Sequence, residues 1–296
     1  MNTQEQLLAL LPPPKVGSAV RQSGYNLSWK FDTQGTTFTT KNIWPREDIT
    51  NNELAYYTDN DNFVTSGSEL DIVVRGNPDN LGGQDLPYTS GLLSTRDEHA
   101  QTYGKFELEA VLPKGRGLWP AFWLLPEFAT WPEEFSDRIL PEIDVMESIG
   151  DDPSIYYGTL HHYENQIQQR DSYTHFCPEH DLTAGPHRYG LEWTPSFMAW
   201  YFDGVYKKVI QTPPFFNVDF HMIVNLAVGG DWPGTPESSD ALGARLNIFN
   251  WHAESQVHIE DHPNYDILKR LLQIKQAHDD CHYIASLDQY ISELIA

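Results

Sequence analysis

Short β-like runs dominate the pattern of hydrophobic and polar positions from about residue 25 to residue 252. Gly, Pro, Asn and Asp interrupt these runs at short intervals, as is typical of strands joined by turns. Asp203-Gly204 separates two such runs and favours a two-residue hairpin turn. The pattern therefore predicts an all-β fold, a sandwich of two antiparallel sheets. The clearest predicted strands are Leu70–Val74, Gly104–Val111, Met198–Phe202 and His221–Leu226.

The strand predicted at Gly104–Val111 alternates polar and apolar residues over most of its length. Strict alternation of this kind is expected when one face of a strand packs on the core and the other faces water. We therefore expect Gly104–Val111 to be half-buried.

The two ends of the chain follow different patterns. Residues 1–20 predict a leader, loose or briefly helical, that three consecutive prolines bring to an end. In residues 256–296 the apolar positions recur at helical spacing in two stripes, which are separated by the polar segment His278–Asp280. This predicts a helical C-terminal extension, a hairpin expected to pack on the sandwich. The β domain itself is expected to span residues 21–255.

The length and composition are consistent with one large domain, and the net charge favours a neutral ligand. The chain has 296 residues, of which 40% are hydrophobic and 13% aromatic. Its 42 acidic and 19 basic residues give a net charge of −23, which repels polyanions. Nucleic acid and strongly sulfated polysaccharide are therefore disfavoured as partners. Nine Trp and fifteen Tyr are consistent with a binding surface or with an aromatic β core.

The sequence gives few signs of location. The first residues lack the basic and apolar regions of a conventional signal peptide, and no stretch is long enough to cross a membrane. A secreted or exported monomer is expected, and a cytosolic protein is left open. Cys177 and Cys281 are too few for a disulfide framework, and whether they pair is also left open.

Three acids in the segment LPEIDVMES carry the candidate chemistry: Glu142, Asp144 and Glu147. On a helix, Glu142 and Glu147 would point about 140° apart. On a regular strand, Glu142 and Asp144 share one face and Glu147 lies on the other. A β-bulge at Val145-Met146 adds one residue and returns Glu147 to the face of the other two acids. A helix beginning at Pro141 is the alternative for this segment.

Two carboxyl groups that converge to about 5 Å are the arrangement of a retaining glycosidase. In this hypothesis Glu142 is the nucleophile and Glu147 is the acid/base. Asp144 adjusts both, because a nearby negative charge raises the pKa of a carboxyl group.

Several segments around the acids resemble glycoside hydrolase family 16, the β-jelly-roll glucanases and galactanases. They follow the family's order over about residues 24–252. The resemblance implies a β-jelly-roll sandwich with a substrate cleft across its concave face. The matching segments are Asn51–Thr58 (NNELAYYT), Tyr88–Gly91 (YTSG), Thr102–Glu107 (TYGKFE), Gly117–Pro126 (GLWPAFWLLP), Gly158–His161 (GTLH), Tyr189–Pro195 (YGLEWTP) and Asn225–Gly234 (NLAVGGDWPG).

Within this family the chain is most similar to bacterial endo-β-1,3-glucanases of the laminarinase type. The resemblance implies a retaining enzyme that cleaves internal bonds of neutral β-glucan, and it gives Glu142, Asp144 and Glu147 the roles stated above. Mixed β-1,3-1,4-glucan and bacterial exopolysaccharide are the alternative substrates. A non-catalytic β-glucan-binding protein is an alternative of another class, disfavoured because all three acids are present.

Six side chains are candidates for holding the sugar. Indole rings can stack on the apolar faces of sugar rings, and polar side chains can bond to hydroxyl groups. By resemblance, Trp119 and Trp123 match aromatic residues of the family's cleft, and Trp123 is expected to be the more buried of the two. The candidates are Trp119, Trp123, Trp232, Asn52, His161 and Asn225.

Among the departures from the family pattern, two bear on the cleft. Leu92 stands where many relatives have Arg, which puts one sugar contact in doubt. The acidic insertion Glu127–Leu140 is placed to edge the cleft.

No cofactor is required, and a structural calcium is left open with its ligands unknown. Asp59–Phe63 is similar to a calcium loop but lacks the Gly and the distal Glu of an EF-hand. His175–His180 contains possible metal ligands at a spacing that fits no common zinc pattern, and a surface loop is expected there.

Overall fold

The structure is a computed structural model of the protein, and it describes residues 26–29, 51–66, 69–83, 85–96, 99–127, 141–164, 167–177 and 179–254. The predicted leader at 1–20 and the predicted helical extension at 256–296 lie outside these residues. So do residues 128–140 of the acidic insertion.

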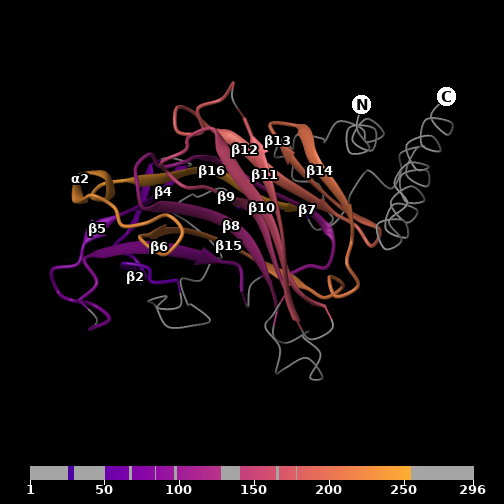
Figure 1. Cartoon of the computed structure of the whole chain (residues 1–296), viewed down its shortest axis with the longest axis horizontal. Coiled ribbons are helices and arrows are strands. Elements are labelled where there is room, and N and C mark those ends of the chain that lie inside the picture. The colour runs from indigo at the N-terminus through magenta and orange to yellow at the C-terminus, as the bar shows by residue number, and fades with distance from the viewer. Residues whose placement is uncertain are drawn as a thin grey trace.

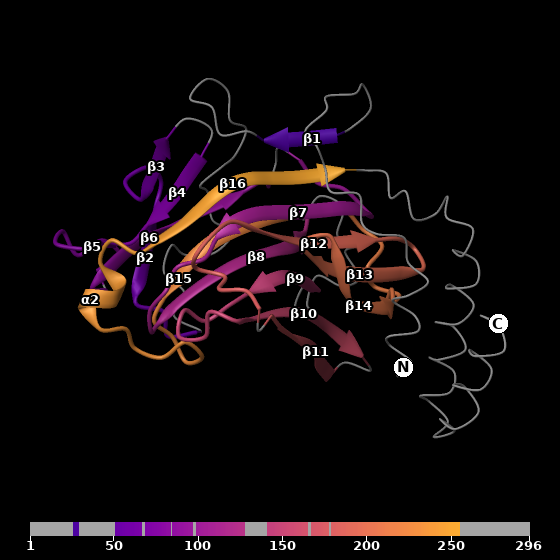
Figure 2. The same ribbon diagram turned by 90° about the horizontal axis from the view of Figure 1, so that it is seen from above.

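Two sheets of eight strands each form the described part of the chain (Figures 1 and 2). The first, called the back sheet, has the order β14-β13-β12-β7-β16-β4-β3, with β1 paired to β16. Its strands are β1 (Asn26–Trp29), β3 (Phe63–Ser66), β4 (Glu69–Val73), β7 (Gly104–Val111), β12 (His187–Trp193), β13 (Phe197–Phe202), β14 (Val205–Gln211) and β16 (Arg245–Glu254).

The second sheet, called the acid sheet, has the order β11-β10-β9-β8-β15-β6-β2, with β5 paired to β6. Its strands are β2 (Ala55–Thr58), β5 (Arg75–Gly76), β6 (Tyr88–Ser94), β8 (Leu118–Pro126), β9 (Glu142–Glu147), β10 (Ile155–Glu164), β11 (Ile167–Phe176) and β15 (Phe220–Val228). Strands of both sheets bend along their length (Figure 2). The one helix among the described residues is α2 (Ser238–Ala241).

The predicted two-sheet sandwich is confirmed. The strand pairings are antiparallel apart from β2 with β6, which is parallel. Asp203 and Gly204 form the predicted hairpin turn between β13 and β14, with φ values of 46° and 78°. Positive φ at both central residues is what a type I′ turn requires.

The core lies between the two sheets and is built from their facing side chains. Phe106 of β7, Trp251 of β16 and Leu191 of β12 meet Phe122 of β8 and Val224 of β15 in one buried cluster. Burial of such a continuous apolar layer is the main favourable term in the folding of a sandwich. For the site, this means that the core holds β8, β9 and β15 in place through their inward-facing side chains.

The expectation that Gly104–Val111 is half-buried is wrong. The strand forms as predicted, but Lys105 and Glu107 on its polar face are 3% and 2% exposed. Their charged groups lie 3.6 Å apart, and the Tyr201 hydroxyl donates a hydrogen bond of 2.7 Å to Glu107. Buried charges of this kind are tolerated because they are paired and hydrogen-bonded.

Two further observations concern membrane-spanning helices and cysteines. No helix among the described residues is long and apolar enough to cross a membrane. Cys177 is a buried free thiol, while Cys281 lies outside the described residues.

Candidate active site

The acid segment forms β9, a strand in the interior of the acid sheet between β8 and β10 (Figure 1). Met146 pairs with Phe122 of β8, and Asp144 pairs with the next residue, Trp123. The register therefore passes over Val145, which is the extra residue of a β-bulge. The predicted strand with a bulge at Val145-Met146 is confirmed, and the alternative of a helix beginning at Pro141 is wrong.

The bulge decides which side chains face the core. Ile143, Val145 and Met146 all belong to the buried core cluster. The side chains of Glu142, Asp144 and Glu147 converge on the opposite face, where each carboxyl group contributes to the electrostatic environment of another. The sequence prediction that one irregular position brings three acids to one face is therefore confirmed.

His161 of β10 lies beside two of the acids. It stands opposite Glu142 in the register, with its Nε2 3.3 Å from Asp144 Oδ2 and 3.8 Å from Glu142 Oε1. The Glu142 side chain is 31% exposed, whereas that of Asp144 is 4% exposed. Glu142 is thus accessible to a ligand, and His161 contacts both acids while its side chain stays 23% exposed.

Trp119 orients the third acid. Its indole Nε1 donates a hydrogen bond of 3.0 Å to Glu147 Oε1. Trp119 and Glu147 lie on neighbouring strands, β8 and β9. The residue predicted as a sugar platform therefore also holds a catalytic candidate in place.

The bulge is supported from the back sheet by Trp200 of β13. This buried indole crosses the core, and its Nε1 donates a hydrogen bond of 3.1 Å to the backbone carbonyl of Asp144. Gly158 of β10 makes room for it, because a Cβ at that position would lie 2.7 Å from Trp200 Nε1. The backbone of the bulged strand thus receives a hydrogen-bond donor from the opposite sheet.

Burial raises the pKa values of all three carboxyl groups, and repulsion from neighbouring acids adds to the rise for Glu142 and Asp144. Burial is the main cause for Glu142, with the charge of Asp144 second, and the pKa rises well above its ordinary value. Burial and then the charge of Glu147 do the same to the pKa of Asp144. Burial also raises the pKa of Glu147, while the Trp119 hydrogen bond and the charges of His161 and Arg170 lower it. The cluster therefore retains a proton at a pH where exposed carboxyl groups have lost theirs.

Aromatic rings form a wall beside Glu147. The Trp232 ring meets Trp119 edge to face at 5.3 Å and Tyr157 at 5.1 Å between ring centres. The loop that carries Trp232 is tied by a 2.9 Å hydrogen bond from Asn52 Nδ2 to Asp231 Oδ1. The structure thus brings Trp119, Trp232 and Asn52 into one part of the site.

A chain of hydrogen bonds holds Trp123 and Asn225, two further residues predicted to bind the sugar. Trp123 Nε1 donates to Asn225 Oδ1 at 2.8 Å, and Asn225 Nδ2 donates to the Tyr57 hydroxyl at 3.2 Å. Tyr57 in turn donates to Glu53 Oε2 at 2.6 Å. Neither indole is buried in the core, and the ranking of Trp123 as the more buried of the two stays a prediction. Both Trp119 and Trp123 are partly exposed, because both lie on the face of β8 that points away from the core.

Leu92 belongs to a small apolar cluster on the same side of the sheet as Trp123. It is 3% exposed and lies with Tyr57, Leu125 and Ile223, and Trp123 packs against the cluster. The position where many relatives have Arg is therefore filled by an apolar side chain that supports an indole.

Four residues of this site were missed by sequence reasoning: Tyr57, Tyr157, Arg170 and Trp200. Tyr57 and Trp200 resemble ordinary core residues in the sequence, since each lies in an apolar strand. Arg170 is opposite His161 in the β10–β11 register. Only a correct prediction of that strand pairing could have placed Arg170 near the acids.

Two groups of possible metal ligands occur among the described residues. One is Glu142, Asp144 and His161, which belongs to the acid cluster, and the other is His180, His187 and Asp203. The calcium-like loop Asp59–Phe63 is in neither group. Asn62 is buried and bonds to Thr58, Thr89 and the carbonyl of Val73. Calcium binding stays a prediction.

Known proteins match the region that builds this site. Residues 48–252 match the model of the family described as Glycosyl hydrolases family 16. A beta-glucanase of Rhodothermus marinus is 36% identical over 227 residues, covering 68% of this chain and 75% of that protein. The endo-1,3-1,4-beta-glycanase EglC of Rhizobium meliloti (strain 1021) is 40% identical over 161 residues. That match covers 54% of this chain but 32% of EglC, so the chain spans about a third of that relative.

A comparison of solved structures points to the same family. The crystal structure of the laminarinase catalytic domain from Thermotoga maritima MSB8 superimposes with a TM-score of 0.68 at 28% identity. The match covers 79% of this chain and 98% of that domain. The predicted jelly-roll class of sandwich is confirmed by this likeness.

We predict that Trp200→Phe destabilises the protein by about 1–3 kcal/mol more than Trp193→Phe, as measured by urea unfolding. Removing the indole donor leaves the buried Asp144 carbonyl without its partner. Trp193 is equally buried, and its Nε1 has no hydrogen-bond partner among the described residues, so it is a matched control. Equal losses in the two variants would show that the hydrogen bond does not hold the bulge.

Proposed function

Because this chain belongs to glycosyl hydrolases family 16, we propose that it cleaves internal bonds of a neutral β-1,3-glucan with retention of anomeric configuration. The observation that carries the proposal is the bulge at Val145, which brings Glu142 and Glu147 to one face with Asp144 between them. A glycosidase needs two carboxyl groups that approach one sugar from one surface.

The choice of substrate is supported by the site and by the relatives. Partly exposed Trp119, Trp123 and Trp232 offer flat apolar surfaces for sugar rings, while Asn52 is an exposed polar partner. Relatives with this domain are named as a beta-glucanase and a laminarinase, and EglC is named for 1,3-1,4-linked glycan. Mixed-linkage glucan or an exopolysaccharide is thus the second candidate substrate.

In the first half of the proposed reaction, the Glu142 carboxylate attacks the anomeric carbon and forms a glycosyl-enzyme ester. Glu147 gives its proton to the departing glycosidic oxygen, so that the bond to the leaving sugar breaks without forming an alkoxide. In the second half, Glu147 takes a proton from water, and the water oxygen replaces Glu142 at the same carbon. Two displacements restore the starting configuration.

The neighbours of the two glutamates support these roles. The raised pKa of Glu147 keeps it protonated as an acid, and Trp119 holds its Oε1 in one orientation. Burial and the charge of Asp144 raise the pKa of Glu142 as well, and the charge of His161 offsets part of that rise. Asp144 lies between the two and links their ionisation: its charge raises the pKa of Glu142, and the charge of Glu147 raises the pKa of Asp144.

The proposal is tested by supplying laminarin, lichenan, agarose and carrageenan side by side and identifying the products. We expect oligosaccharides from laminarin, with NMR showing the β anomer as the first product. Equal or faster cleavage of lichenan alone would favour the mixed-linkage alternative. Tight glucan binding without any product would favour the glucan-binding alternative, and an initial α anomer would contradict the retaining mechanism.

Substitution separates the two glutamates. We expect Glu142→Gln and Glu147→Gln each to lower kcat on laminarin by at least about 100-fold, since each removes a group needed in the transition state. With an aryl β-glucoside oligosaccharide, whose phenolate leaves without a proton, Glu147→Gln should recover formation of the glycosyl-enzyme and Glu142→Gln should not. Glu237→Gln, at an exposed position, is the control. Near-normal laminarin hydrolysis by either variant would remove that residue from the mechanism.

Trp119→Phe tests the pKa of the acid. The indole N–H stabilises the ionised form of Glu147 and so lowers its pKa. Without it the pKa rises, and the alkaline limb of the kcat/KM profile should move to higher pH because Glu147 stays protonated longer.

Trp232→Phe is the matched control for this shift. It alters the same aromatic wall but keeps the Trp119–Glu147 hydrogen bond, so it should change KM with the alkaline limb in place. An unmoved limb in Trp119→Phe would contradict the assignment of Glu147 as the acid.

A further inference from the structure

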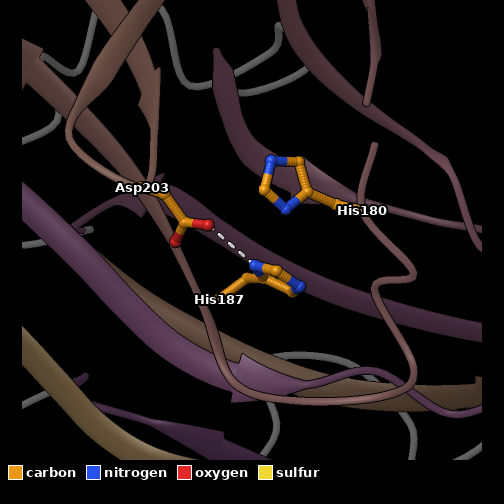
Figure 3. A group of neighbouring side chains, drawn as sticks. All are labelled: His180, His187 and Asp203. Atoms are coloured by element: carbon orange, nitrogen blue, oxygen red, sulfur yellow. Dashed lines mark hydrogen bonds and ion pairs between the residues drawn. The ribbon is translucent and has the colours of Figure 1, made fainter. Parts of the chain in front are cut away.

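Two histidines and an aspartate meet beside β12 of the back sheet, away from the acid-bearing strand β9. His180 lies in the connection between β11 and β12, His187 begins β12, and Asp203 is in the β13–β14 turn. Figure 3 shows the three side chains pointing toward one another. One nitrogen or oxygen from each lies within 4.8 Å of the other two.

Two of the donors are already fixed in position. His187 Nδ1 lies 2.7 Å from Asp203 Oδ2, and the backbone N–H of Arg188 donates to Asp203 Oδ1 at 2.8 Å (Figure 3 draws the first contact). The Asp203 N–H also bonds to the Arg188 carbonyl at 2.9 Å. The carboxylate is thus held by two neighbouring residues of β12, which limits the entropy lost when a ligand binds.

The segment that carries His180 is anchored on both sides. The N–H groups of Cys177 and Leu182 bond to the carbonyls of Ser154 and Pro153 at 2.8 Å each, and both side chains are buried. The His180 N–H bonds to the Cys177 carbonyl at 3.0 Å. His180 is therefore exposed but lies on a backbone that the fold has placed.

Phe202 forms the floor of the group. The ring centres of His180 and His187 lie 5.2 Å and 5.0 Å from that of Phe202, the first edge-on and the second stacked. Lys207 Nζ also packs on this ring, at 5.7 Å from its centre. A cation in the group would feel that ammonium, so the Asp203 carboxylate is needed to offset it.

We propose that His180, His187 and Asp203 bind one divalent transition-metal ion, with zinc as the best-fitting ion. Two imidazole nitrogens and one carboxylate oxygen suit Zn²⁺, Ni²⁺ or Cu²⁺ better than Ca²⁺ or Mg²⁺, which prefer oxygen ligands. Three protein ligands leave a position for water, as in open zinc sites. Zinc–nitrogen bonds of about 2.0–2.1 Å require the exposed His180 ring to turn inward.

The ion would act as a clip between three segments. It would join the β11–β12 connection to β12 and to the β13–β14 hairpin. β13 also carries Trp200, which donates to the Asp144 carbonyl at the bulge. Binding to the folded state alone raises stability, so zinc should raise the melting temperature.

The test is titration of the purified, chelator-stripped full chain with Zn²⁺ by calorimetry, together with melting curves in zinc and in EDTA. The variants are His180→Gln and Asp203→Asn. Asn tolerates the positive φ of residue 203 and keeps an acceptor for the Arg188 N–H. His162→Gln is the matched control, because His162 and Asp171 form a similar pair at 3.0 Å that belongs to no three-ligand group within the part of the chain that the structure describes.

We expect the wild type and His162→Gln to bind one equivalent of zinc that both site variants lose or bind at least about tenfold more weakly. The zinc-dependent rise in melting temperature should disappear with it. Superimposable titrations of wild type and His180→Gln would overturn the proposal and leave an aromatic cluster with a His–Asp pair only. Any zinc held instead by Glu142, Asp144 and His161 would persist in both site variants and inhibit hydrolysis, and that pattern alone would overturn the proposal as well.

Discussion

An extra residue in one interior strand is the constraint on which the site depends. Side chains on a strand alternate between two faces, so Glu142 and Glu147 would point in opposite directions across a flat β9. The bulge at Val145 moves Glu147 to the face of Glu142 and places both Val145 and Met146 in the core. Because β9 lies between β8 and β10, paired strands on both sides hold the irregularity in register.

Such an irregularity has a local cost that the opposite sheet offsets. A bulge interrupts the hydrogen-bond ladder, and here the Trp200 indole satisfies the Asp144 carbonyl across the core. The arrangement requires a glycine at 158, where a side chain would meet that indole. The back sheet therefore takes part in placing the carboxyl groups, although none of its residues belongs to the acid cluster.

Concentrating negative charge in a buried cluster also has an energetic cost. Three carboxyl groups with raised pKa values are harder to ionise together than exposed acids. Hydrogen bonding from Trp119 and the charges of His161 and Arg170 partly relieve this. The cluster therefore holds a proton more tightly than exposed acids do, and acid/base chemistry on a sugar requires such a proton.

The sequence by itself determined the strands, the hairpin at Asp203-Gly204 and the need for a bulge, because these follow from the alternation and spacing of neighbouring residues. It placed Glu142, Asp144 and Glu147 on one face for the same reason. Only the tertiary structure decided that Lys105 and Glu107 are buried, that Trp123 is partly exposed and that Trp200 reaches Asp144. It alone joined His180 and His187 to Asp203. These outcomes depend on which strands lie side by side and on what covers each face, and residues far apart in the chain settle both.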